Sequence, residues 1–231
     1  MKNDCKTMNC TGCFVKSPIF KLFSEEELAT VESVRCEVIY NPDEIIYKQG
    51  TKTTQIVTIT SGLAKSYIEG TNGKNFILDI IKPVTMIGGP GIYVDSKHHF
   101  SLKAIETTRC CFFDVHVIKE IIRNNPQVSE AVIEMISKRV ITYFDKFIFL
   151  TQKQVVGRVA DNLIYLYEHI YNCNPMRVTV SFQDMAEMTG MTKDTFVRVI
   201  RDLVNEQTII FEDDLLTILD FKKLQLLSQM G

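Results

Sequence analysis

The sequence predicts an α+β fold: an N-terminal antiparallel β-roll of the jelly-roll type, a long dimerisation helix and a C-terminal winged helix-turn-helix. Three observations predict it. Short apolar segments separated by glycine turns fill residues 35–115, and residues 127–150 contain neither glycine nor proline. Two short capped helices with a glycine turn between them then lie in residues 181–205. We expect domains at residues 1–125, 126–150 and 151–231.

The composition is that of a globular protein with free thiols. The chain has 231 residues, 45% of them hydrophobic, and a net charge of −2. No apolar run approaches the roughly 18 residues of a membrane span, and the N-terminal MKNDCKTMNC lacks the apolar core of a secretory signal. With seven cysteines and no export signal, we expect a cytoplasmic protein without membrane contact, whose thiols are free or bind metal.

The roll is predicted from short β segments separated by turns. Ser24 and Glu27 predict a capped helix before them. Gly50, Gly62 and residues 70–73 mark turns, and no helices alternate with the strands as in a parallel sheet. A sandwich or jelly roll is therefore expected. The predicted segments are residues 44–47, 55–61, 64–68, 75–81, 85–87, 101–105 and 110–113.

The helix predicted at residues 126–150 carries two apolar stripes. A heptad series runs from Ile133 to Leu150, and a second stripe includes Val128 and Val132. One stripe can cover the roll, and the other requires a partner, most simply the same helix of a second subunit. The alternative is a helix buried within one chain. The expected dimer interface comprises Val132, Met135, Ile136, Val140, Tyr143 and Phe147. Another amphipathic helix is expected at residues 154–171.

A helix-turn-helix is predicted after a short β-rich run at residues 177–180. Ser181 can cap the first helix, and Gly190 can end it in the left-handed conformation. Thr192 can cap a second helix at residues 193–205. Apolar residues fall on one face of this helix, namely Phe196, Val199, Ile200 and Leu203. Residues 209–211 and 215–219 predict a hairpin, which would be a wing.

The charge of this region is unfavourable for DNA except at one place. From residue 176 onward there are six Lys or Arg against nine Asp or Glu, although phosphate contacts supply most DNA affinity. Lys193, Arg198 and Arg201 nevertheless share the polar face of the second helix. We expect modest, salt-sensitive binding that requires two copies. The alternative is a signal-binding dimeric interaction module with a degenerate DNA reader.

The chain resembles the CRP/FNR family of transcription regulators over nearly its full length. PDEIIYKQGTKTTQIVTITSGLAKSYIEGTNGKNFILDIIKP resembles the family's cyclic-nucleotide-binding-type roll, and TVSFQDMAEMTGMTKDTFVRVI resembles its DNA reader. The resemblance implies a cytoplasmic homodimer that binds a palindromic operator in double-stranded DNA and contacts RNA polymerase. It places base contacts at Lys193, Asp194, Val197 and Arg198, with Arg198 as the guanine reader. Thr192 and Arg201 complete the expected DNA-binding set, and Asp194 replaces the family's usual glutamate.

The roll departs from the cyclic-nucleotide-binding branch of the family. That branch uses a glutamate for the ribose and an Arg-Ser pair for the phosphate. The equivalent stretches here read Gly88-Gly89-Pro90 and His98-His99-Phe100, without an arginine to bind a phosphate. Classical cAMP binding is therefore not expected, and the effector is unknown. Gly88, Gly89, His98 and His99 are the candidate effector-pocket residues.

The cysteines resemble those of the FNR-like, iron–sulfur branch of the family. HHFSLKAIETTRCCFFD is similar to that branch's late strand, and Cys111 falls at its lone ligand position. Cys5, Cys10 and Cys13 could supply three more thiolates to a cluster. Their spacing differs from the branch's usual one. Zinc on four thiolates, or a metal-free tail with Cys110 or Cys111 as core residues, are the alternatives.

An enzyme is not expected. Adjacent side chains on a strand point to opposite faces, so His98 and His99 cannot easily bind one metal. No set of two histidines and one carboxylate is visible at workable spacing, and solvated loop histidines are the simpler interpretation. The sequence thus predicts a homodimeric, sequence-specific transcription regulator that responds to a redox, gas or small-molecule signal through its β-roll.

Overall fold

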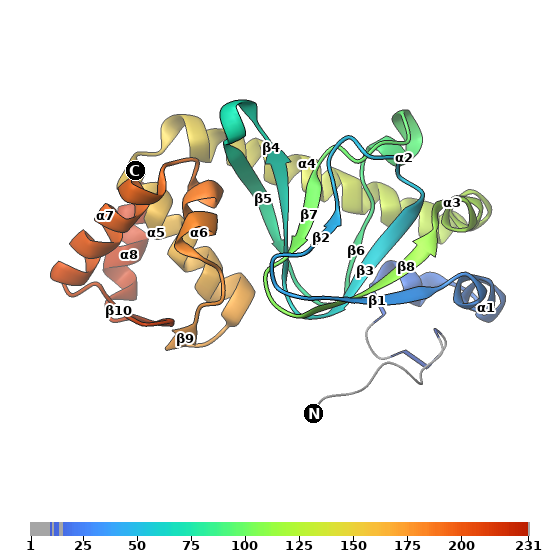
Figure 1. Cartoon of the computed structure of the whole chain (residues 1–231), viewed down its shortest axis with the longest axis horizontal. Helices are drawn as coiled ribbons and strands as arrows, with labels where there is room; N and C mark the ends of the chain where they lie inside the picture. Colours follow the sequence, from blue (N-terminus) through green and yellow to red (C-terminus); the bar gives the residue numbers. More distant parts are fainter. Residues whose placement is uncertain (1–9, 11, 14–15, 231) are drawn as a thin grey trace. The chain divides into compact units, whose positions relative to one another are not determined.

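The computed structural model describes residues 10, 12–13 and 16–230. The chain divides into two units (Figure 1). The first comprises residues up to Ile68 together with Ile80–Arg139, and the second comprises Glu69–Asp79 and the residues from Val140 onward. No helix in the described part of the chain is both long and apolar enough to cross a membrane.

Two four-stranded sheets form the predicted antiparallel roll. One has the order β1-β8-β3-β6, with β1 (Cys36–Tyr40), β8 (Thr108–Asp114), β3 (Gln55–Ser61) and β6 (Thr85–Ile87). The other has the order β2-β7-β4-β5, with β2 (Ile45–Tyr47), β7 (Ser101–Ala104), β4 (Ala64–Glu69) and β5 (Asn75–Ile81). Strand β8 pairs with β1 on one side and with β3 on the other, antiparallel in both cases. Cys111 lies opposite Glu37 and Thr58 in this register.

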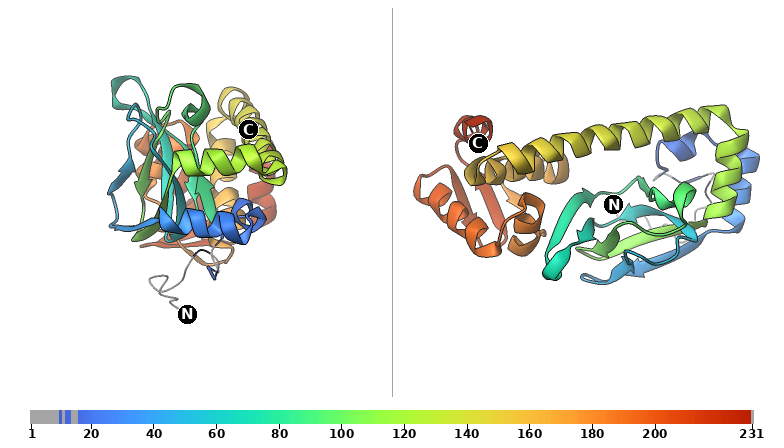
Figure 2. Two further views of the ribbon diagram at one scale, coloured as in Figure 1. Left: turned by 90° about the vertical axis from the view of Figure 1, so that its right-hand side faces the viewer. Right: turned by 90° about the horizontal axis from the view of Figure 1, so that it is seen from above.

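The helices of the roll domain cover one side of the first sheet. They are η2 (Ile19–Leu22), α1 (Glu25–Ser33), α2 (Gly91–Val94) and α3 (Val115–Asn124), and a further turn, η3 (Thr71–Gly73), joins β4 to β5. Ser24 caps α1 as predicted, because its Oγ accepts from Glu27 N and its own N–H donates to the Glu27 carboxylate. Helices α1 and α3 lie side by side, as the left view of Figure 2 shows.

One apolar core joins these helices to the sheet. Phe20 of η2 packs against Phe113 of β8 with ring centroids 4.9 Å apart. Ile118 of α3 and Val128 of the following helix are fully buried in the same cluster. The α3 segment is helical because its apolar residues recur at helical spacing and are buried on one face. Asp114 caps it, and its apolar positions at 115, 118 and 121 point inward.

The long helix α4 (Pro126–Gln152) confirms the prediction for residues 126–150 and extends it by two residues. Figure 2 shows it as one unbroken helix. It begins in the first unit and ends in the second.

The second unit contains the predicted winged helix-turn-helix. Its helices are α5 (Val155–Tyr165), the π-helical segment η4 (Leu166–Tyr171), α6 (Phe182–Thr189), α7 (Lys193–Asn205) and α8 (Phe221–Met230). Its sheet has the order β10-β11-β9, with β10 (Ile209–Glu212), β11 (Leu215–Ile218) and β9 (Met176–Arg177). Strands β10 and β11 form the expected antiparallel hairpin.

Two predicted elements differ in detail. The β-rich run at residues 177–180 is a strand only as far as Arg177. Beyond it, the N–H groups of Thr179 and Val180 donate to the Tyr171 hydroxyl at 2.8 and 3.2 Å, so they are not available to a sheet. The helix expected at residues 154–171 becomes π-helical from Leu166, and Asn172 ends it in the left-handed conformation.

Candidate functional site

The turn between α6 and α7 is built as the sequence predicts. Ser181 Oγ accepts from Asp184 N at 3.1 Å and caps α6. Gly190 follows α6 with φ +63°, a conformation in which glycine has no steric penalty. Thr192 Oγ1 accepts from Thr195 N at 3.3 Å, and α7 begins at Lys193. Two capped ends and one glycine therefore fix the direction of α7.

The inner face of α7 holds it in the domain. Its four predicted core residues are all buried: Phe196, Val199, Ile200 and Leu203. Phe182 of α6 packs against Phe196, with ring centroids 6.1 Å apart, and against Phe211 of β10, at 4.9 Å. Phe182 thus joins α6, α7 and the hairpin in one aromatic cluster, which sets the orientation of the outer face of α7.

The outer face of α7 carries the predicted DNA-binding set. Thr192, Lys193, Asp194, Arg198 and Arg201 are exposed, and Val197 is half-buried. Within the described chain, none of the three cations of this face forms an ion pair with a carboxylate. Positions 193, 194, 197, 198 and 201 follow the helical repeat, so they make one stripe. Such a stripe of free cations is suited to phosphates and base edges.

The hairpin tip is acidic. Glu212, Asp213 and Asp214 are exposed there, and Asp213 has φ +54°. Asp214 is held in place, because its carboxylate lies 3.3 Å from Arg177 Nη1 and its carbonyl accepts from Val178 N. The three carboxylates at the tip of the wing would repel the phosphates of DNA.

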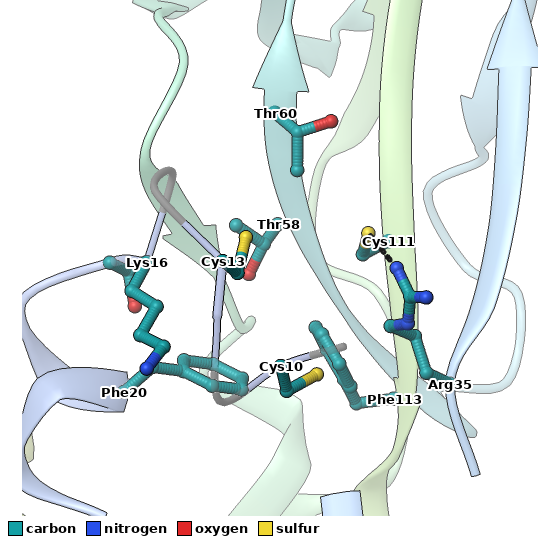
Figure 3. Close-up of a pocket in the computed structure, with 10 residues that line it drawn as sticks. Cys10, Cys13, Lys16, Phe20, Arg35, Thr58, Thr60, Cys111 and Phe113 are labelled. Atoms are coloured by element: carbon teal, nitrogen blue, oxygen red, sulfur yellow. Dashed lines mark hydrogen bonds between the residues drawn. The ribbon is translucent and has the colours of Figure 1, made fainter. Parts of the chain in front are cut away.

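A cavity of about 30 Å³ lies in the roll domain, between the N-terminal segment and the first sheet. Figure 3 shows its lining side chains, with Cys10 and Cys13 on the segment and Cys111 on β8. The rest of the lining is Lys16, Ser17, Phe20, Arg35, Thr58, Thr60 and Phe113. The described members of the predicted cysteine set therefore come together, although they are about a hundred residues apart in the sequence.

Arg35 organises one wall of this cavity. Its Nη1 donates towards Cys111 Sγ at 3.8 Å, the contact drawn as a dashed line in Figure 3. Its guanidinium also lies 3.2 Å from a Glu32 carboxylate oxygen and 3.5 Å from a Glu37 oxygen. Glu37 in turn accepts from Arg109 at 2.5 Å. The cation is thus fixed in position by carboxylates on either side.

Two further thiols, Cys10 in the cavity lining and Cys110 in the core, are buried in different surroundings. Cys10 lies beside Glu32, which accepts a hydrogen bond from the Cys10 backbone N–H. Burial, then the neighbouring Glu32 carboxylate, raises the pKa of the Cys10 thiol to about 12. Burial likewise raises the pKa of Cys110 to about 12, and its side chain is fully buried. Cys110 is therefore a core thiol, as one alternative predicted.

The described thiols do not fit a metal ion. No group of three or more His, Cys, Asp or Glu within the described residues is placed to hold one, although Cys10, Cys13 and Cys111 line the same cavity. Cys5 lies outside the described residues. Cys36 and Cys173 are exposed, so they do not contribute to packing.

The predicted effector-pocket residues lie elsewhere, and none of Gly88, Gly89, His98 and His99 lines this cavity. His98 is not a solvated loop histidine, which corrects that interpretation. Only 9% of its surface is exposed, and its ring stacks on Tyr47 with centroids 3.9 Å apart. His99 is exposed and pairs with Asp95 at 3.1 Å.

These residues also do not fit a cyclic nucleotide. Residues 82–100 contain no arginine to pair with a phosphate. The space next to Gly88 is filled, because a Cβ at this glycine would lie 2.9 Å from Ile92 Cδ1. Lys119 reaches this part of the roll, but its Nζ donates to the Ile92 carbonyl at 3.0 Å and lies over the Tyr93 ring.

The predicted dimer residues divide into two groups. Val132 is buried in the core of its own chain and Met135 packs against that core, so both stabilise the roll domain, and their part in a dimer interface stays a prediction. Tyr143 is half-buried. Seven large apolar side chains of α4 are 41–65% exposed, and four of them lie outside the expected interface set: Ile133, Ile141, Phe144 and Ile148. The other three are Ile136, Val140 and Phe147.

Sequence reasoning missed most of the cavity. Arg35, Ser17, Thr58 and Thr60 were not candidates, because each acquires its role from a neighbour distant in the chain. Arg35 and Cys111 are 76 residues apart, and only strand pairing brings them together. The sequence signal for this site was the candidate cysteine set, of which Cys10, Cys13 and Cys111 line the cavity.

Known proteins share both domains. A cyclic nucleotide-binding domain model matches residues 37–125, and a Crp-like helix-turn-helix domain model matches residues 157–227. The transcriptional activator protein Anr of Pseudomonas protegens is 23% identical, over 77% of this chain and 74% of its own.

Solved structures share the fold. FixK2 from Bradyrhizobium japonicum superimposes with a TM-score of 0.76 at 20% identity, covering 84% of this chain and 97% of its own. A regulator assigned to the crp/fnr family from Eubacterium rectale gives 0.77 at 18% identity, covering 92% and 98%. The chain belongs to the CRP/FNR family of transcription regulators.

Proposed function

We propose that this protein is a homodimeric, sequence-specific DNA-binding regulator whose roll domain responds to a redox, gas or small-molecule signal. The observation that carries the proposal is the outer face of α7, where Lys193, Arg198 and Arg201 are exposed and free of carboxylate partners among the described residues. Its inner face is fully packed, so the cations are held on a rigid element.

Within this face, Arg198 is the proposed base reader. A guanidinium can donate two parallel hydrogen bonds to guanine O6 and N7. Lys193, at the start of α7, lies where a helix N-terminus approaches the DNA backbone. Thr192, Asp194, Val197 and Arg201 complete the proposed contact set. Val197 is suited to a thymine methyl group, since it is apolar and half-buried.

The exposed apolar side chains of α4 support the homodimer. Seven large apolar residues between Ile133 and Ile148 are 41–65% exposed, more than a single soluble chain normally leaves on one helix. A second copy of α4 would cover them. Two α7 helices could then enter successive major grooves about 34 Å apart, which requires a palindromic operator. Contact with RNA polymerase is proposed from the family.

The helix α4 also offers a route for the signal. Val128 and Val132 belong to the core of the roll domain, whereas the residues from Val140 onward belong to the unit that carries α7. A signal that repacks the roll core would therefore act directly on the helix that leads to the reader.

The rival function is a dimeric interaction module whose reader no longer binds DNA. The acidic hairpin tip and the excess of carboxylates after residue 176 favour it. Both functions share the roll and the helix α4, and only DNA binding distinguishes them.

The test is selection of DNA from a randomised palindromic pool, followed by titration at several salt concentrations. We expect Arg198→Ala to weaken specific binding by about 1–3 kcal/mol. Lys222→Ala, which removes an exposed cation of the same unit outside the α7 stripe, serves as the matched control. Equal discrimination between operator and scrambled DNA by both variants would reject the role of Arg198. Failure to select any sequence would favour the rival function.

A further inference from the structure

We infer that the cavity beneath the N-terminal segment is a peroxide-reactive dithiol site, in which Cys111 is oxidised first and Cys10 then closes an intrachain disulfide with it. The inference rests on the proposed function, because it names the chemistry of the signal. Cys10 and Cys111 line the same cavity and belong to the same core cluster.

Cys111 is the sulfur prepared for attack. Its side chain is buried on β8, and the Arg35 guanidinium donates towards its Sγ at 3.8 Å. A neighbouring cation stabilises sulfur as the nucleophilic anion. Glu32 and Glu37 fix the guanidinium in this position.

Cys10 is the second sulfur. It lines the same cavity as Cys111 and packs in the same core cluster. Its thiol hydrogen-bonds to Glu32, and its backbone N–H donates to the same carboxylate. Glu32 is therefore placed to accept the thiol proton when Cys10 attacks. Arg35 donates directly towards Cys111, whereas Glu32 contacts Cys10, and these contacts give the two thiols different roles.

The cavity has room for a small oxidant, although most of its accessible lining is apolar. Its volume of about 30 Å³ suits a molecule not much larger than water. Ser17 and Thr58 line it, are only 2% and 4% exposed, and have hydroxyl oxygens without a hydrogen-bond partner in the described chain. Buried hydroxyls normally have partners.

The reaction balances without a cofactor. The Cys111 thiolate attacks one peroxide oxygen, the O–O bond breaks, and hydroxide leaves, so that Cys111 becomes a sulfenic acid. Cys10 passes its proton to Glu32 and attacks Cys111 Sγ. The S–S bond forms as the S–O bond breaks, and the hydroxyl leaves as water with that proton. The two sulfurs lose two electrons, and one peroxide becomes one water and one hydroxide, which takes up the proton that Cys111 released to solvent on forming its thiolate.

The bond would change the roll domain in two ways. It would link the segment that precedes η2 covalently to β8. It would also remove the Cys111 sulfur anion from Arg35, whose guanidinium would keep its contacts with Glu32 and Glu37.

The test uses the full-length protein, reduced, desalted under nitrogen and treated with one equivalent of hydrogen peroxide. Mass spectrometry of a non-reduced digest should identify a Cys10–Cys111 peptide pair. In Cys10→Ser, dimedone should label Cys111 as a sulfenic acid. Arg35→Gln should slow Cys111 oxidation by about tenfold, the effect of a tenfold smaller thiolate fraction. Cys36→Ser and Cys173→Ser, which change exposed thiols, should react as the wild type does.

Three results would overturn the inference. They are a bond from Cys111 to Cys5 or Cys13 in place of Cys10, equal oxidation rates of all thiols, and stoichiometric iron or zinc that protects the cysteines. DNA binding by the reduced protein is measured in parallel. If the reduced protein does not bind DNA but its thiols react as expected, the proposed function is rejected and the thiol results stand. If the thiols do not react but DNA binding is normal, only the inference is rejected. The Arg35→Gln rate keeps the test decisive if a cysteine variant does not fold.

Discussion

Arg158 Nη1 donates a hydrogen bond of 2.8 Å to the carbonyl oxygen of Thr189. Thr189 is the last residue of α6, so this carbonyl has no partner within its helix. The contact ties α5 to the end of α6 immediately before Gly190, where the chain turns into α7. The orientation of the DNA-reading helix thus depends on a side chain about forty residues from its centre.

We predict that Arg158→Met lowers the free energy of unfolding by about 1.5 kcal/mol. This value is the lower end of the range for a hydrogen bond from a charged donor. Nε of Arg158 is buried without a partner in the described chain, so removing this unpaired group offsets part of the stability lost with the hydrogen bond. Urea denaturation of the whole protein measures the change. Arg201→Met, which alters an exposed arginine with no ion pair among the described residues, should leave the unfolding midpoint unchanged. Equal effects of both substitutions would contradict the role of the Thr189 contact.

The exposed stripe of α4 predicts the effect of a charge in the proposed dimer interface. Ile136→Glu should convert the dimer to monomers, because it would bury an unpaired carboxylate against the partner helix. Sedimentation velocity measures the outcome. Gln127→Glu adds the same charge to an exposed position on another face of α4, and it should leave the dimer intact. A dimeric Ile136→Glu variant would place the interface elsewhere.

The acidic wing predicts a gain in DNA affinity. Asp213→Asn should tighten binding at low salt, because it removes a charge that repels phosphate, and the gain should vanish as salt screens that charge. Asparagine tolerates the positive φ of this position, so the turn should be kept. Fluorescence anisotropy at two salt concentrations tests this prediction. Glu168→Gln, an exposed acid of the same unit outside the wing, should have no such effect.

Buried His98 predicts a loss of stability in mild acid. Burial lowers the pKa of His98 below its ordinary value of 6.5, so the unfolded chain binds the proton more readily than the folded one. The contribution of His98 to the free energy of unfolding is therefore fully present above about pH 6.5, and it is lost as the pH falls below that value. His98→Phe keeps the stacking on Tyr47 and should remove this part of the pH dependence. Urea denaturation at about pH 7.5 and 5.5 measures it. The exposed His116→Gln should retain the wild-type dependence.

Local sequence patterns predicted the reader almost residue for residue. The caps Ser181 and Thr192, the turn at Gly190 and the bounds of α7 at residues 193–205 are as expected. These features depend on neighbours within four residues, through side-chain caps and the 3.6-residue repeat. The strands at 55–61, 75–81 and 85–87 were predicted for the same reason, since glycine turns delimit them.

Local patterns were weaker where two signals competed. Valine and threonine at residues 178–180 favour a strand, but the Tyr171 hydroxyl takes the N–H groups that a strand would use. Helix α3 was not predicted, although Asp114 caps it and Val115, Ile118 and Ile121 show its period. Those signals follow directly after β8, whose own apolar run obscures them.

The sequence by itself determined the two domains, the helix between them and the cationic stripe of α7, because periodicity and caps act over short distances along the chain. Only the tertiary structure decided which apolar stripe of α4 is covered by its own roll, since a stripe does not identify the surface it meets. It also decided that Arg35 adjoins Cys111 and that Cys10 adjoins Glu32. Those contacts join residues 76 and 22 positions apart, and the pairing of β1 with β8 and the packing of α1 create them.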